Sequence, residues 1–268
     1  NLNNLEIIKS FILGIVQGLT EFLPVSSSGH IEIFKEILNF SYDSENGLFF
    51  TLILHLATAM STLIYFWVDV KKIIYSLFKL KKDENFNFSL MIIVSMIPAG
   101  LVGFFFENKI NQLFNGNLLL VGSMLIITSI LLFVSDKINN LKKELTVMNA
   151  FVIGIAQALA ILPGISRSGS TIATSLFLGI NRDLAAKFSF LMVIPIIVGS
   201  SLKMIIYDNL VFEEVIVINY IVGFLSALIS GYYACKWMIL LVRKSKLFYF
   251  SIYCLIVGLI SISYSLVQ

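Results

Sequence analysis

The sequence predicts an all-α integral membrane protein arranged as an inverted-topology repeat, with six full transmembrane helices and two re-entrant helical hairpins. Of its 268 residues, 58% are hydrophobic and 13% are charged. Soluble domains are about 45–50% apolar and about 25% charged, so a soluble domain is excluded. The apolar runs are long and continuous, which favours helices over the short alternating segments of a membrane β-barrel. The third observation is a broken, polar motif that occurs twice.

The first broken motif lies within residues 5–39. An apolar run over 5–23 is interrupted by Gln17 and Glu21 and ends at Pro24, and the next run, 28–39, is short and charged. A full crossing needs roughly 20 apolar residues, which neither piece supplies. Broken backbone at membrane depth is tolerated only where protein or a water-filled cavity covers it. We therefore expect two short helices that form a re-entrant hairpin.

The pattern restarts after residue 140, with a second hairpin at about 147–180. At an offset of 140 residues the identical pairs include Gly14/Gly154, Ile15/Ile155, Gln17/Gln157, Leu19/Leu159, Ser26/Ser166, Ser28/Ser168 and Gly29/Gly169, and Pro24 matches Pro163 after a one-residue slip. The expected spans are 48–67, 88–106 and 117–135, then 185–206, 215–241 and 246–266. A hairpin adds no crossing, so each half crosses the membrane three times. Because three is odd, the second half enters the membrane in the opposite orientation. We divide the single membrane domain into repeats 1–140 and 141–268, with binding sites near their interface.

The distribution of positive charge predicts the orientation. Lysines and arginines gather in segments 68–87, 136–147, 181–187 and 236–246, and include Lys81 and Lys142. The opposite side has Lys9, Lys35, Lys109 and Lys203 and an acidic loop, 207–214, with Asp208, Glu213 and Glu214. By the positive-inside rule the first group is cytoplasmic. The termini and the first hairpin then face outward, and the basic segment 69–82 is expected to be a solvated loop attracted to the membrane surface, not to nucleic acid.

The two motifs carry the chemistry. Ser26-Ser-Ser-Gly29 and Ser166-Arg-Ser-Gly-Ser-Thr171 each follow a proline and precede a short helix. Serine is a good N-cap, and a helix N-terminus is a ready anion site. At matched positions one half supplies Ser27 and the other supplies Arg167, whose planar fork suits phosphate. With Glu21 and His30, these residues make a nucleophile, an acid/base pair and an oxyanion clamp, as phosphoryl transfer requires.

The predicted catalytic residues are therefore Glu21, Ser27, His30 and Arg167, and the predicted phosphate-binding residues are Gln17, Ser26, Ser28, Ser166, Ser168 and Thr171. Structural alternatives remain open. Glu21 and Arg167 can form a purely interhelical ion pair, a serine can simply let helices approach, and Thr171 can cap a helix. Gln17 either orients Glu21, one helical turn away, or bonds the neighbouring hairpin. His55, without a nearby acid in sequence, is expected to pack or to make an interhelical hydrogen bond.

At these residues the chain resembles the undecaprenyl-pyrophosphate phosphatase family, the bacitracin-resistance membrane phosphatases. The family's [E/Q]xxxE element appears as Gln17-Gly-Leu-Thr-Glu21, followed by Phe22-Leu-Pro-Val-Ser-Ser-Ser-Gly-His30. Its PGxSRSxxT element appears as Pro163-Gly-Ile-Ser-Arg-Ser-Gly-Ser-Thr171. This chain has Gln rather than Glu at position 17, which puts in doubt a mechanism that shares the chemistry between two carboxylates.

The resemblance implies an enzyme that cleaves a C55 polyprenyl diphosphate to the lipid monophosphate and inorganic phosphate. It places the reaction at the outer face of the bacterial plasma membrane, where it recycles the carrier for cell-wall synthesis and confers bacitracin resistance. Ser27 is the expected nucleophile, with His30 as the competing choice. The resemblance implies stimulation by Mg²⁺ or Ca²⁺, with Glu21 as a potential ligand. The expected partners are the lipid substrate and membrane lipid, without nucleic acid; the oligomeric state, a homodimer included, stays open. A polyprenyl-phosphate flippase is the alternative function.

Overall fold

The described residues of the computed structural model are 2–40, 44–80, 82–113, 117–139, 143–207 and 214–267, and they are helical apart from short connections. In chain order the helices are α1 (Leu2–Phe22), α2 (Ser27–Ile37), α3 (Ser44–Tyr65), α4 (Trp67–Phe78), α5 (Glu84–Phe105), α6 (Glu107–Leu113), α7 (Leu118–Asp136), α8 (Val147–Leu159), α9 (Arg167–Phe177), α10 (Arg182–Tyr207), α11 (Glu214–Arg243) and α12 (Leu247–Val267). Within these ranges the β structure is confined to one isolated bridge, between Lys143 and Ile180.

Helices α5, α7, α10, α11 and α12 are each long and apolar enough to cross a membrane. Helices α3 and α4 pass the same test together, although they are bent by 86° relative to each other. The five single helices match five of the predicted spans to within a few residues, and α3 alone covers most of the sixth, 48–67. The predicted hairpins fall on α1–α2 and α8–α9, of which α2, α8 and α9 are short, whereas α1 has 21 residues. The chain is a multi-pass, all-α membrane protein.

The prediction of a solvated loop over 69–82 was wrong for most of its length, because residues 67–78 form helix α4. Val70 and Ser76 of α4 are buried, whereas Lys71 and Lys72 are exposed. The Ser76 hydroxyl donates to Asp83 Oδ2 (2.9 Å), which fixes the end of α4 next to the start of α5. The basic segment is therefore an amphipathic helix, with one face buried and the lysines exposed. Lys81, Lys142, Asp208 and Glu213 fall outside the described residues, as do the side chains of Lys203 and Glu214.

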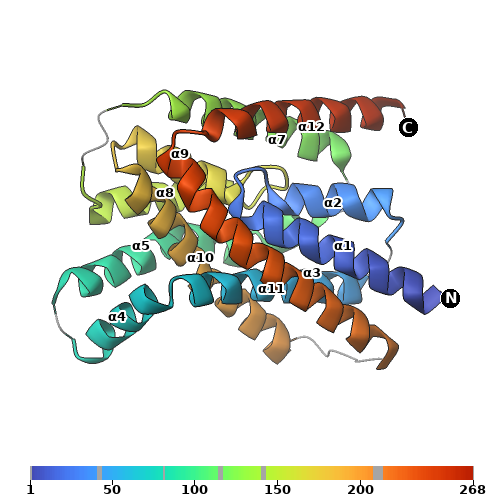
Figure 1. The fold of residues 1–268 in the computed structure, drawn as a ribbon, viewed down its shortest axis with the longest axis horizontal. Coiled ribbons are helices and arrows are strands. Elements are labelled where there is room, and N and C mark those ends of the chain that lie inside the picture. The colour runs from blue at the N-terminus through green and yellow to red at the C-terminus, as the bar shows by residue number, and fades with distance from the viewer. Residues whose placement is uncertain are drawn as a thin grey trace.

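Close helix pairs determine the packing (Figure 1). Helix α1 packs along α11, α8 packs along α5, and α7 lies beside α12. Glycines permit the first two contacts. A Cβ atom on Gly18 would lie 2.6 Å from the Ala227 carbonyl oxygen, and one on Gly154 would lie 2.4 Å from the Ser95 carbonyl oxygen. Any side chain at either position would force the helices apart.

The two helix breaks, α1–α2 and α8–α9, meet inside the protein. A Cβ atom on Gly29 would lie 3.2 Å from Gly164 Cα, and one on Gly169 would lie 3.3 Å from Pro24 Cβ. Thr128 of α7 supports the second break, since its hydroxyl donates to the Gly164 carbonyl (3.1 Å) and accepts from the Ser166 N–H (3.0 Å). Gly164 has a φ of 99°, which glycine adopts without strain. The repeated motifs are thus packed against each other.

Candidate active site

The same capping bond starts the helix that follows each break. Ser26 Oγ accepts from the Gly29 N–H at 3.3 Å, and Ser166 Oγ accepts from the Gly169 N–H at 3.1 Å. A serine N-cap satisfies one of the free N–H groups of the first helical turn. The first helical residues are therefore Ser27 on α2 and Arg167 on α9. Both predicted catalytic groups occupy the same position of facing helix starts.

Glu21 joins the two breaks. Its Oε2 accepts hydrogen bonds from Ser27 Oγ (2.8 Å) and from Gln17 Nε2 (2.9 Å). Its Oε1 pairs with Arg167 Nη2. The Glu21 side chain is only 6% exposed, so this carboxylate lies in the interior with its charge matched by the guanidinium. One buried carboxylate thus holds the nucleophile candidate and the cation candidate at once.

Helix α10 holds Arg167 from the other side. Arg167 Nη1 donates to the Ser189 carbonyl at 3.2 Å. The hydroxyls of Ser189 and Thr171 lie 2.7 Å apart, and Thr171 also donates to the Arg167 carbonyl at 2.9 Å. Ser189 was not predicted, because a single serine in an apolar span carries no sequence signal of its own. The contacts of Ser189 fix the Arg167 guanidinium and also α9, the helix that carries Arg167.

A cavity of about 150 Å³ lies against this cluster. It is lined by Glu21, Ser27, Ser28, His55, Ala160, Ile161, Ile165, Arg167, Val193 and Ile197. The polar wall comes from α1, α2, α3 and α9, and the apolar wall comes from the α8–α9 break and α10. Four of the predicted residues, Glu21, Ser27, Ser28 and Arg167, therefore share one cavity.

The other predicted phosphate-binding residues do not line this cavity. Gln17 is fully buried and bonds Glu21, which agrees with an orienting role. Ser26 and Ser166 are helix caps. Ser168 Oγ donates to the Leu23 carbonyl at 3.3 Å, across the two breaks. Like Thr171, these groups surround the cavity and support its walls.

His30 is also directed away from the cavity. Its Nδ1 lies 2.8 Å from the Ser26 carbonyl oxygen and its Nε2 lies 2.8 Å from the Tyr253 hydroxyl. Because a carbonyl only accepts, Nδ1 carries the hydrogen and Nε2 accepts from Tyr253. The imidazole is stacked on the Tyr253 ring, with centroids 5.5 Å apart. The structure therefore brings together Glu21, Ser27 and Arg167, and places His30 behind the turn that carries Ser27.

His55 of α3 is a site residue that the sequence argument ranked too low. It lines the cavity, and its Nδ1 lies 3.0 Å from Gln17 Nε2 and 3.3 Å from Glu21 Oε2. The expected interhelical hydrogen bond is present, and its partners are Gln17 and Glu21, two of the predicted site residues. The nearest acid is distant in sequence and close in space. Gln17 and Glu21 on one helix face were the signal, since such a face needs a partner on a neighbouring helix.

The cluster does not form a cage for a metal ion. Both oxygens of Glu21 already accept from protein donors, and within the described ranges no three His, Cys, Asp or Glu side chains lie close enough to hold an ion. Mg²⁺ in proteins is bound by one or two carboxylates together with substrate phosphates. The expected Mg²⁺ or Ca²⁺ stays a prediction.

Comparison with known proteins decides the family. The family model described as "Bacitracin resistance protein BacA" matches residues 10–260, which include both motifs and all the cavity residues. The chain belongs to the BacA family. Among the similar proteins is an undecaprenyl-diphosphatase of Christiangramia forsetii, 49% identical over 264 residues, which are 98% of this chain and 100% of the relative.

Other relatives of this BacA-family chain have the same name. An undecaprenyl-diphosphatase of Bacteroides fragilis is 46% identical over 268 residues, covering 98% of this chain and all of the relative. One of Methanococcus vannielii is 40% identical over 259 residues, covering 96% of this chain and 99% of the relative. The likeness spans whole chains, so it includes the span that supplies His55 and the helix that supplies Ser189.

Proposed function

We propose that this BacA-family protein hydrolyses undecaprenyl diphosphate to undecaprenyl phosphate and inorganic phosphate. One observation carries the proposal: Ser27 and Arg167, from separate helix breaks, bond the two oxygens of Glu21 at the wall of one cavity. A hydroxyl beside a carboxylate base and a guanidinium is the set of groups that phosphoryl transfer uses. The names of its relatives support the same substrate.

In the first step, Ser27 Oγ attacks the terminal phosphorus of the diphosphate. A bond forms between Ser27 Oγ and phosphorus, the bond from phosphorus to the bridging oxygen breaks, and undecaprenyl phosphate leaves. The Ser27 proton passes to Glu21 Oε2, which already accepts the hydrogen bond at 2.8 Å. In the second step, a water oxygen attacks the phosphorus of the phosphoserine and the bond from phosphorus to Ser27 Oγ breaks. Ser27 Oγ takes back the proton held by Glu21, and inorganic phosphate departs with the protons of the water.

Proton transfer from Ser27 to Glu21 also leaves the positive charge of Arg167 without its carboxylate partner. Before reaction the Arg167 guanidinium is neutralised by Glu21. When Glu21 takes the Ser27 proton, it loses its negative charge, and the guanidinium is left to bind the phosphate as charge develops on the bridging oxygen. An interaction that strengthens in the transition state raises the rate, whereas one of equal strength in the ground state does not. Arg167 is held in place for this step by the Ser189 carbonyl.

The supporting groups have positioning roles in this scheme. Gln17 and His55 hold the Glu21 carboxylate, and His30 fixes the Ser26 carbonyl next to Ser27. Ser28 lies in the cavity wall and is the remaining predicted phosphate ligand on α2. The prenyl tail leaves the cavity sideways, toward lipid.

We assign the inverted repeat, residues 1–140 against 141–268, to the same proposal. The helix contacts support it: α1 packs on α11, and their counterparts α8 and α5 pack on each other. The matched caps at Ser26 and Ser166 support it as well. The two hairpins then enter from opposite sides, with the active site open to the exterior, where hydrolysis recycles the carrier and confers bacitracin resistance. The flippase alternative is not favoured, because Ser27 and Arg167 make the two halves chemically different.

The test is phosphate release from undecaprenyl diphosphate by the purified protein in detergent. We expect activity in the wild type and none above background in Ser27→Ala, whose fold should persist because only one hydroxyl is lost. The matched control is Ser123→Ala, a serine of α7 that bonds the Leu119 carbonyl at the exposed face. An inactive wild type that moves lipid phosphate between leaflets after reconstitution into vesicles would overturn the enzyme assignment. Full activity in Ser27→Ala would overturn the nucleophile.

A further inference from the structure

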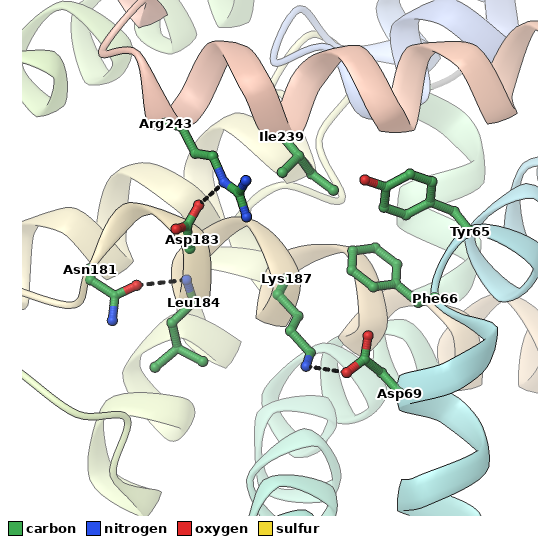
Figure 2. Close-up of a pocket in the computed structure, with 9 residues that line it drawn as sticks. All are labelled: Tyr65, Phe66, Asp69, Asn181, Asp183, Leu184, Lys187, Ile239 and Arg243. Atoms are coloured by element: carbon green, nitrogen blue, oxygen red, sulfur yellow. Dashed lines mark hydrogen bonds and ion pairs between the residues drawn. The ribbon is translucent and has the colours of Figure 1, made fainter.

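A second and larger cavity, of about 720 Å³, lies where the α3–α4 bend meets the start of α10 and the end of α11. We call it the elbow pocket. Its polar lining consists of Tyr65, Asp69, Asn181, Asp183, Lys187 and Arg243 (Figure 2). It shares no lining residue with the cavity of Glu21 and Ser27. The proposed catalytic reaction leaves this pocket without a role.

Two ion pairs border the elbow pocket. Lys187 Nζ lies 2.6 Å from Asp69 Oδ1, joining α10 to α4, and Arg243 Nε pairs with Asp183, joining α11 to α10. These four side chains are 35–57% exposed. Ion pairs so exposed contribute little to stability, so each member can exchange its partner for a group on a ligand.

The charge balance restricts the ligand. Two acids and two bases give the lining no net charge. A simple anion would leave Asp69 and Asp183 unmatched beside it, and a simple cation would do the same to Lys187 and Arg243. A ligand with one group of each sign satisfies both pairs. Figure 2 shows the Tyr65 hydroxyl directed toward the Ile239 and Arg243 side of the pocket, where it adds a neutral hydrogen-bonding group.

The surroundings place the pocket at the level of lipid headgroups. Helix α4 turns 86° away from α3 at this point, as expected of an amphipathic helix that lies along a membrane surface. Trp67 on α4 and Trp237 on α11 are more than half exposed, and Lys71 Nζ lies 4.8 Å from the centre of the Trp67 ring. Exposed tryptophans next to lysines are typical of the membrane–water interface. The positive-inside rule predicts that this interface is the cytoplasmic one.

We propose that the elbow pocket binds the headgroup of a phospholipid that carries both a phosphate and a primary ammonium group. Arg243 and Lys187 bind the phosphate, the guanidinium by two parallel N–H bonds. Asp69 and Asp183 accept hydrogen bonds from the ammonium. Phe66 and Ile239 pack beside the glycerol and the first acyl carbons. The bound lipid joins α4, α10 and α11 through their charged ends.

Native mass spectrometry of the detergent-solubilised protein, titrated with one lipid at a time, tests the proposal. The probes are dioleoyl phosphatidylethanolamine, phosphatidylcholine and phosphatidylglycerol. We expect tight binding of one phosphatidylethanolamine and binding weaker by about tenfold for the other two. Equal binding of phosphatidylglycerol would contradict the proposal by showing a simple anion site. Equal binding of phosphatidylcholine, whose ammonium has no N–H groups, would contradict it by showing that Asp69 and Asp183 do not accept hydrogen bonds from the headgroup.

Two variants locate the site. The double change Asp183→Asn with Arg243→Gln should weaken phosphatidylethanolamine binding about tenfold, and Arg243→Lys, which keeps the ion pair but loses the fork, should weaken it by a smaller factor. The control is Lys9→Gln, which breaks the Lys9–Glu6 pair on α1. Unchanged binding in both pocket variants, or an equal loss in the control, would overturn the assignment. Thermal unfolding of each variant shows that it is folded.

Discussion

At the scale of single residues, the account depends on what surrounds Glu21. Its two oxygens connect Ser27 and Gln17 on one side to Arg167 on the other. A buried carboxylate is costly unless it is paired and hydrogen-bonded, and here both conditions are met. Removing Arg167 would leave that charge uncompensated and cost about 3–5 kcal/mol of stability, so truncation alone cannot isolate its role in the reaction.

Arg167→Lys keeps the charge and loses the planar fork. A lysine ammonium cannot bond both Glu21 and the Ser189 carbonyl with the same geometry, so phosphate release should fall by about 10²–10³-fold with the fold intact. Kinetics and thermal unfolding measured on one preparation check this. Arg182→Lys, at the start of α10, is the control and should keep nearly full activity. Wild-type rates in Arg167→Lys would mean that a point charge is enough.

The contacts of His30 predict that it acts together with Tyr253. Tyr253→Phe removes the hydrogen bond to His30 Nε2 and should lower kcat by about 2–10-fold, because the Ser26 carbonyl next to Ser27 is then held less firmly. The same change in a His30→Gln background should have no further effect. Tyr249→Phe on the same helix is the control. Additive losses from Tyr253→Phe and His30→Gln would show that the two residues act independently.

Sequence reasoning identified the groups to which we assign the chemistry but not all of their neighbours. Glu21 and Arg167 were conspicuous as charges at membrane depth, and Ser27 followed from its position opposite Arg167. Ser189 was missed and His55 was ranked too low because their partners lie on other helices. A single sequence shows that the face of Gln17 and Glu21 needs a partner, but not which helix supplies it. His30 was assigned to acid/base chemistry because it follows the serines, although its ring is directed toward α12.

At the scale of elements, glycine contacts determine how closely the helices approach. The apolar pattern predicted α5, α7, α10, α11 and α12 as spans, with ends correct to a few residues. The repeated motif predicted the breaks between α1 and α2 and between α8 and α9, but α1 has 21 residues and is not the short helix that was expected. Helix α4 was missed because its two lysines, the lysines that follow it and its proximity to a span end suggested a loop. Burial of its apolar face, which includes Val70, depends on tertiary contacts that charge content does not reveal.

Gly18→Ala and Gly154→Ala test the close pairs α1–α11 and α8–α5. Each new methyl would overlap a backbone carbonyl, so each should lower stability by about 1–3 kcal/mol. Gly100→Ala on α5 is the control, because a Cβ atom there would meet nothing within 4 Å, and it should be neutral or stabilising by up to about 1 kcal/mol. Thermal unfolding in detergent measures all three. Equal effects at the three positions would contradict the packing.

At the scale of the whole molecule, the positions of the two termini bear on orientation in the membrane. Helix α1 begins and α12 ends at the same side of Figure 1, which agrees with an even number of crossings. The positive-inside rule predicts that this side is the exterior. The native thiols, Cys235 and Cys254, are both fully buried and free. A thiol introduced at the surface can therefore be labelled without a signal from the native cysteines.

Lys109→Cys and Lys244→Cys report the two sides. A membrane-impermeant maleimide applied to intact cells should label Lys109→Cys and should label Lys244→Cys only after the cells are opened. The unaltered chain, with its buried thiols, gives the background. The reverse pattern of labelling would place the proposed active site on the cytoplasmic side and would contradict its role in recycling the carrier at the outer face.

The central claim is that Ser27 receives the phosphoryl group while Arg167 of the other helix break binds it. The most direct measurement is to mix the protein with undecaprenyl diphosphate radiolabelled in its terminal phosphate, quench within the first turnover, and map the label by proteolysis. The account predicts phosphoserine at Ser27 in the wild type and no labelled peptide in Ser27→Ala. Label on His30 or His55, or turnover by Ser27→Ala at the wild-type rate, would contradict it.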